Sequence, residues 1–158
     1  MTTLELQIVG DRSGEFDLHP TEAVFAMLVG ELGHEGQVPA GVINVALVDD
    51  EHVRWLNRDQ AGHDYATDVL SFSYIEDGGE PIDGVIGEMV VSVEAAERQA
   101  QAAETNLAEE VALLVLHGTL HILGWDHQTP EQQDRMQQLQ RKLITAAGYR
   151  YREFVWQD

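Results

Sequence analysis

Three of the seven histidines in this 158-residue chain lie close together, at His117, His121 and His127. Residues four apart share one face of a helix, so the first two rings are expected side by side. Gly124 follows where that helix can end, because glycine adopts the left-handed terminating conformation without steric cost. The turn after it can return His127 to the same point. Three histidines that leave a fourth position open are typical of catalytic zinc sites, so we predict one Zn²⁺ per chain, although other divalent transition metals also suit imidazole ligands.

The spacing of these histidines matches the H-E-x-x-H-x-x-G-x-x-H pattern of metzincin proteases, with one chemical difference. The protease glutamate, which acts as general base, is replaced here by Gly118. Glycine cannot take a proton from water. The sequence therefore predicts the metal ligands without the usual peptidase chemistry, and a metallopeptidase is the least favoured reading.

The run from His117 to His127, HGTLHILGWDH, resembles the H-G-x-L-H-L-x-G-[YW]-D-H signature of the YbeY family. Two upstream segments agree with that family in order and spacing. Residues 67–72 read TDVLSF, and residues 86–92 read IGEMVVS, in which Glu88 stands for the usual aspartate. Together the three segments extend the resemblance over roughly residues 40–150.

The resemblance implies a single α+β domain over residues 1–158, with a zincin-like arrangement of a four-stranded mixed sheet and a histidine-bearing helix. It implies a zinc-dependent, single-strand endoribonuclease that acts in maturation of the 3′ end of small-subunit (16S) ribosomal RNA and in ribosome quality control. The implied partners are ribosomal RNA and the small ribosomal subunit, with ribosomal proteins or a ribosome-assembly GTPase as further partners. The implied location is the cytoplasm.

One position departs from the family pattern. The family carries an arginine six residues before the threonine of its T-D-V-L-S-F segment, and here that position is Ala61. Arg58 and His63 lie nearby, but only arginine offers a rigid bidentate fork suited to phosphate. We predict Arg58 as the anion clamp. The alternative is a metal-binding ribosome-biogenesis factor whose nuclease activity is weak or lost.

Four further side chains near the predicted site each have two readings. Asp126 either orients a ligand histidine by accepting its second N–H or caps the turn. The hydroxyls of Thr67 and Ser71 either hold phosphate or water, or satisfy backbone at a strand end. Trp125 either stacks on a base or packs beside the site. Among these residues only Asp126 is predicted, with the histidines and Arg58, to take part in catalysis.

Composition limits the remaining classes of protein. The chain has no cysteine, so disulfides and cysteine-based zinc sites are excluded. It begins without the basic and apolar segments of a signal peptide, and no apolar stretch approaches the length of a membrane span. We expect a cytoplasmic protein that does not contact membranes.

The net charge of −19 is unexpected for a protein that binds RNA, because phosphate contacts normally require a basic patch. The nearest approach to one is near the C-terminus: Arg141, Lys142, Arg150 and Arg152. Three explanations stay open: a partner supplies the basic surface, the surface is adapted to high salt, or the charge simply maintains solubility.

Hydrophobic periodicity predicts the elements that position the site. Strands are expected at residues 4–9, 42–48, 69–74 and 85–93, with a hairpin joining the last two and a strand-like tail at 149–156. Helices are expected at residues 20–32, 49–57, 94–105, 106–123 and 130–148, and loops at 33–41 and 59–66. The first helix is expected to bury Val24, Met27, Leu28 and Leu32.

Overall fold

A four-stranded mixed sheet forms the centre of the molecule. The structure, a computed structural model, describes residues 4–10, 12, 14–34, 38–61, 69–125 and 128–151, with the backbone alone for 57–61. The strands are β1 (Leu4–Val9), β2 (Gly41–Val48), β3 (Val69–Ser73) and β4 (Val85–Ser92). Their order in the sheet is β1-β2-β4-β3. Strand β2 pairs in parallel with both β1 and β4. Strand β3 pairs antiparallel with β4 through the predicted hairpin.

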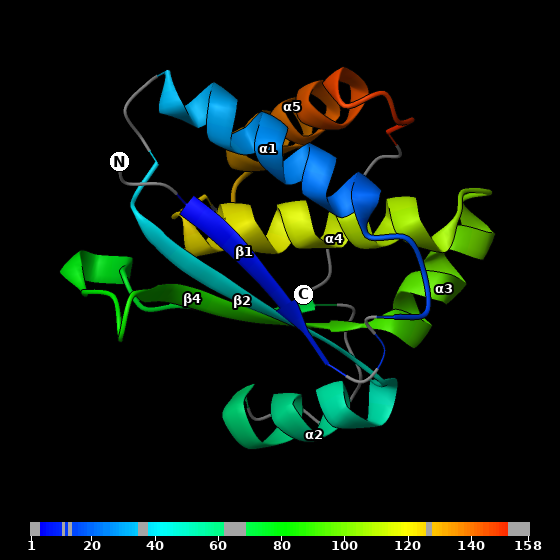
Figure 1. Cartoon of the computed structure of the whole chain (residues 1–158), viewed down its shortest axis with the longest axis horizontal. Helices are drawn as coiled ribbons and strands as arrows, with labels where there is room; N and C mark the ends of the chain where they lie inside the picture. Colours follow the sequence, from blue (N-terminus) through cyan, green and yellow to red (C-terminus); the bar gives the residue numbers. More distant parts are fainter. Residues whose placement is uncertain are drawn as a thin grey trace.

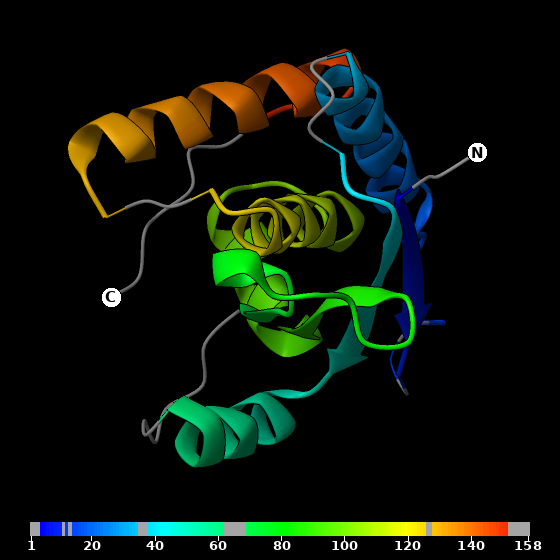
Figure 2. The same cartoon turned by 90° about the vertical axis from the view of Figure 1, so that its left-hand side faces the viewer.

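Helices cover both faces of this sheet. They are α1 (His19–Gly33), α2 (Asp50–Ala61), α3 (Val93–Ala102), α4 (Leu107–Ile122) and α5 (Pro130–Ala146), with a short 3₁₀ turn η1 (Glu76–Gly78) in the hairpin. Figure 1 shows α4 against one face of the sheet and α2 beneath the other. In the view of Figure 2, α1 and α5 lie over α4 on the side away from α2. The predicted α+β class and four-stranded mixed sheet are therefore confirmed.

Helix α4 is the central helix of the core. Asn106 caps its start, since Oδ1 accepts a hydrogen bond of 2.9 Å from the backbone N–H of Glu109. Every residue from Glu110 to Leu120 is buried. Its C-terminal end lies directly on β4, where a methyl group added at Gly87 would come within 2.5 Å of Ile122 Cγ2. The histidine-bearing end of α4 is thus held closely against the sheet.

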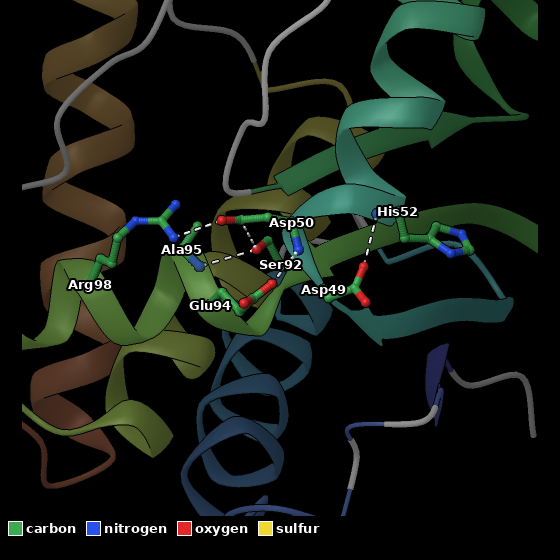
Figure 3. Close-up of polar contacts among 7 residues, drawn as sticks. All are labelled: Asp49, Asp50, His52, Ser92, Glu94, Ala95 and Arg98. Carbon is green, nitrogen blue, oxygen red and sulfur yellow. Dashed lines mark hydrogen bonds and ion pairs between the residues drawn. The ribbon is translucent and has the colours of Figure 1, made fainter.

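A polar cluster at the start of α2, shown in Figure 3, fixes this helix to the end of β4 and the start of α3. Asp49 caps α2 by accepting a backbone N–H three residues on. The backbone N–H of Asp50 donates to Glu94 Oε1 at 2.8 Å. The Asp50 carboxylate accepts hydrogen bonds from the Ser92 hydroxyl and, at 2.6 Å, from Arg98 Nη1. Burial raises the pKa of Asp50, but the hydrogen bonds from Arg98 and Ser92 outweigh it and leave that pKa below its ordinary value.

Three local predictions were wrong in part. Residues 59–61 belong to α2 rather than to a loop, because no helix-breaking residue occurs before Gly62. Met27 is exposed, since α1 packs along the face that carries Val24 and Leu28. Residues 149–151 form no strand, and the rest of the predicted tail lies outside the described residues. No helix in the described ranges combines the length and the apolar character required to cross a bilayer.

Candidate metal site

Helix α4 ends just before Gly124, where the sequence predicted the helix to stop. Gly124 has φ +100°, the left-handed region, and donates its N–H to the carbonyl of His121 at 3.0 Å. Trp125 donates its N–H to the carbonyl of Leu120 at 2.9 Å. These two bonds form a Schellman motif, which satisfies carbonyls of the last helical turn and reverses the chain. The predicted helix stop is confirmed, and the chain turns just before the position of the third predicted ligand.

His117 and His121 present their rings to each other on one face of α4. Their Nε2 atoms are 3.1 Å apart, and their rings lie edge to face with centroids 4.6 Å apart. Two nitrogens that each bind a tetrahedral zinc at about 2.0–2.1 Å lie about 3.3 Å from one another. The separation in this structure therefore fits two ligands of one metal ion. His117 is buried and His121 is half-buried, so the ring of His121 is the more accessible of the two.

A buried glutamine on α5 contacts the first of these histidines. Gln140 Oε1 lies 2.8 Å from His117 Nδ1, and Gln140 is fully buried. Gln140 Nε2 donates to the hydroxyl of Tyr151 at 3.0 Å. This contact was not predicted from the sequence. Its signal was a glutamine four residues after Met136 and four before Ile144, where the helical period calls for an apolar side chain.

Gly118, which stands where metzincins carry their glutamate, packs against the sheet. A Cβ at this position would lie 2.9 Å from Met89 Sδ and 3.4 Å from Val69 Cγ2. The residue therefore points toward the sheet rather than toward the ring nitrogens of the two histidines. A side chain at this position would have to displace the end of Met89.

Strand β3 runs beside the histidine end of α4. The Ser73 hydroxyl donates to the carbonyl of Ile122 at 2.9 Å and so satisfies a carbonyl at the end of the helix. Ser71 lies two residues earlier on the same face of the strand and is half-buried. Ser71 is thus on the side of the sheet that carries α4, as the phosphate or water reading requires.

Trp125 packs against the core while remaining half-buried. With its neighbours it lines a surface cavity of about 260 Å³, formed by Leu123, Gly124, Trp125, Gln132 and Arg135. The packing reading of Trp125 therefore holds, and its partial exposure keeps the stacking reading open.

The remaining predicted site residues are Asp126, His127 and Thr67, all of which lie outside the described residues. Arg58 lies in the last turns of α2, and its side chain is likewise outside what the structure describes. Within the described ranges, no group of three or more His, Cys, Asp or Glu side chains suited to a metal ion forms. The structure thus brings together two of the three predicted ligands, and the third stays a prediction.

Comparison with known proteins identifies the family of this chain. The family model described as Endoribonuclease YbeY matches residues 12–148. An Endoribonuclease YbeY from Heliobacterium modesticaldum is 35% identical over 161 residues, covering 92% of this chain and 96% of the relative. Another, from Carboxydothermus hydrogenoformans, is 40% identical over 117 residues, covering 74% of this chain and 78% of the relative. The solution structure of TM1509 from Thermotoga maritima has a TM-score of 0.59 at 26% identity, covering 90% of this chain and 88% of that chain. The chain belongs to the endoribonuclease YbeY family.

Proposed function

We propose that this protein is a zinc-dependent endoribonuclease that hydrolyses single-stranded RNA. We propose further that it acts in maturation of the 3′ end of small-subunit (16S) ribosomal RNA and in ribosome quality control. The observation that carries the proposal is the convergence of His117 and His121, whose Nε2 atoms lie 3.1 Å apart on a buried helix of a family named for endoribonucleases.

Each residue has a stated task in this proposal. His117, His121 and His127 hold one zinc ion, although another divalent transition metal would suit the same donors. A bound zinc ion supplies Lewis acidity, which lowers the pKa of water to about 7 in favourable sites and offsets charge on a phosphate. Asp126 orients a ligand histidine by accepting its second N–H. Arg58, on α2, binds a phosphate oxygen of the RNA and so places the scissile bond.

The substrate must be bound despite a net charge of −19. Ribosomal RNA and the small ribosomal subunit are the proposed partners. Ribosomal proteins or a ribosome-assembly GTPase would supply positive surface to offset this negative charge. Recognition then depends on the metal and a few arginines, with the rest of the phosphate contacts made by the partner.

A second candidate function is favoured by Ala61, which stands where the family has arginine. In this reading the protein keeps the metal site but serves as a ribosome-biogenesis factor with weak or lost nuclease activity. A metallopeptidase is disfavoured, because Gly118, which packs on Met89, stands where the general base of the peptidases would be.

The proposal is tested by incubating the zinc-loaded protein with single-stranded RNA that spans the 3′ end of a 16S precursor. Metal-stripped protein and the variant His121→Ala are compared with it, and both are expected to lose cleavage. His52→Ala is the matched control, because His52 is an exposed histidine on α2 and points away from the polar cluster in Figure 3. This control is expected to cleave as well as the original chain.

Measuring the bound zinc shows whether an absence of RNA cleavage contradicts the assignment of the metal ligands or the proposed nuclease activity. Near-stoichiometric zinc in His121→Ala would overturn the ligand assignment. Intact RNA after long incubation with protein that still holds zinc would overturn the nuclease and favour the biogenesis factor. In that case Ala61→Arg, which restores the family's cation, is expected to create cleavage.

A further inference from the structure

Gln140 is a fully buried polar side chain on the apolar face of α5, and its contacts reach the candidate metal site. Burying an amide in an apolar interior is unfavourable unless its donors and acceptor are bonded. Here the oxygen faces His117 Nδ1 at 2.8 Å, and the nitrogen faces Tyr151 at 3.0 Å. The amide is therefore hydrogen-bonded through both its oxygen and its nitrogen. Its oxygen contacts the ring of His117, which is one of the predicted metal ligands.

The oxygen of Gln140 restricts the chemistry of His117. A carboxamide oxygen only accepts hydrogen bonds, so the ring nitrogen that faces it must donate. A neutral imidazole carries one proton, and placing it on Nδ1 leaves a lone pair on Nε2. Nε2 is the atom that faces His121 and that a metal would bind.

The amide itself is held in this orientation. If the amide were turned over, its NH₂ group would face His117 and force the proton onto Nε2. Tyr151 favours the orientation described, because its hydroxyl donates to Gln137 Oε1 and accepts the N–H of Gln140. The guanidinium of Arg141 lies 5.5 Å from the centre of the Tyr151 ring and helps to hold it in place.

Tyr151 reaches these partners because the chain reverses after α5. Gly148, at φ +95°, follows the helix, and Tyr149 donates its N–H to the carbonyl of Ile144 at 3.1 Å. This turn folds residues 149–151 back along their own helix. Tyr151, near the C-terminus, thereby contacts Gln140, the residue that faces His117.

We propose that Gln140, oriented by Tyr151 and Gln137, is a positioning residue that keeps the proton of His117 on Nδ1 and so frees Nε2 for a metal ion. The metal half of this statement rests on the proposed function, whereas the tautomer half does not. Outer hydrogen-bond partners of this kind typically change metal affinity by about 10–100-fold when they are removed.

The first measurement is nitrogen NMR of the metal-free, full-length protein with ¹⁵N-labelled histidine, which reports which ring nitrogen of His117 carries the proton. The original chain is expected to show the Nδ1–H form. Gln140→Met, which keeps the length of the side chain and removes the acceptor, is expected to populate the Nε2–H form. Gln140→Glu keeps an acceptor oxygen and is expected to retain the proton on Nδ1.

The second measurement is the zinc dissociation constant by chelator competition. Gln140→Met is expected to weaken zinc binding about 10–100-fold, and Gln140→Glu is expected to restore most of it. If Gln140→Met fails to fold, Tyr151→Phe takes its place, since it removes only the group that orients the amide. That variant is expected to show a mixture of the two tautomers and a smaller loss of affinity.

An unchanged His117 tautomer in a folded Gln140→Met or Tyr151→Phe variant would overturn the inference. Equal loss of zinc affinity in Gln140→Met and Gln140→Glu would overturn it as well, because only packing would then matter. Failure of the original chain to bind zinc would instead overturn the proposed function. The tautomer measurement needs no metal, so the two failures are distinguishable.

Discussion

Gly118 lies between the two histidines on α4, and a side chain at this position must displace the end of Met89 on the strand beneath it. Met89 Sδ occupies the space that a Cβ would need. This single residue distinguishes the histidine motif of this chain from the motif of the metallopeptidases. The difference is chemical, since a base is missing, and a longer side chain would also have to displace Met89.

We expect Gly118→Glu to be destabilised by about 3 kcal/mol or more, because it places a carboxylate in a fully buried position. Gly118→Ala is the matched control. Its cost from displacing the flexible end of Met89 is partly offset by the helix propensity of alanine, so its net loss should not exceed about 2 kcal/mol. Urea unfolding measures both values. Equal stability of the two variants, or peptidase activity in Gly118→Glu, would contradict the packing argument.

The position of the histidine pair depends on the contact between helix α4 and strand β4. Gly87 allows this contact, because a methyl group there would meet Ile122 Cγ2 at 2.5 Å and the Phe72 carbonyl oxygen at 2.9 Å. The backbone carbonyl cannot move aside as a side-chain end can. The distance between helix and sheet is therefore set by a glycine in the strand.

Two glycine-to-alanine changes should act in opposite directions. Gly87→Ala is expected to cost about 1–3 kcal/mol through overpacking and to weaken zinc binding, since it displaces the histidine end of α4. Gly30→Ala, in α1 where nothing lies within 4 Å of the added Cβ, is expected to gain about 1 kcal/mol. Denaturant unfolding with chelator competition tests the pair. A destabilised Gly30→Ala together with a neutral Gly87→Ala would show that the assignment of the packing is wrong.

The cluster in Figure 3 joins α2 to β4 and α3, so it fixes the helix that carries Arg58. Its centre is the Asp50 carboxylate, whose pKa is lowered in the folded state. A lowered pKa contributes stability above the ordinary value of about 3.9, and this contribution is lost as the pH falls through the folded pKa. The side chain of Arg98 is 62% exposed, so solvent screening limits the ion pair to about 0.5–1 kcal/mol.

We therefore expect Asp50→Asn to be less stable than the original chain by about 1 kcal/mol at pH 7 and equally stable well below pH 4. Glu51→Gln is the control, since it removes the same charge from an exposed position in the same helical turn. Thermal unfolding across this pH range measures the difference. If Asp50→Asn were still less stable than the original chain well below pH 4, the Asp50 carboxylate would not act through its charge.

At the scale of the whole molecule, the dominant property is the excess of 28 acidic over nine basic residues. Like charges at this density repel one another and oppose the compact state. Added salt screens them over a distance that falls to about 3 Å at 1 M. The same screening reduces the repulsion between this acidic chain and a negatively charged RNA, whereas for a basic protein it weakens an attraction.

We expect the melting temperature to rise by several degrees between about 0.05 M and 1 M potassium chloride, because screening relieves this repulsion. Potassium sulfate at matched ionic strength separates screening from the general strengthening of hydrophobic burial by sulfate. An unchanged melting temperature in chloride would contradict both the repulsion argument and the hypothesis of adaptation to high salt.

Most of the helices and strands, and the local part of the site, could be predicted from the sequence alone. Alternating apolar residues predicted β1, and the i, i+4 spacing placed His117 and His121 on one face of α4. Gly124 predicted the end of that helix, which the structure confirms. Such features depend on contacts between residues a few positions apart, where propensity and periodicity are sufficient. The end of α2 was less certain, because a polar helix terminus and a polar loop have similar compositions.

Only the tertiary structure decided how distant segments complete the site. Gln140 approaches His117 across 23 residues of sequence, and Gly118 meets Met89 across a comparable distance. The insertion of β4 between β2 and β3 likewise joins segments far apart in the chain. These contacts depend on how layers pack, and packing free energy is shared among many side chains rather than encoded in a local pattern. A buried glutamine in an apolar stripe signals that a partner exists, but only the packed helices identify it as His117.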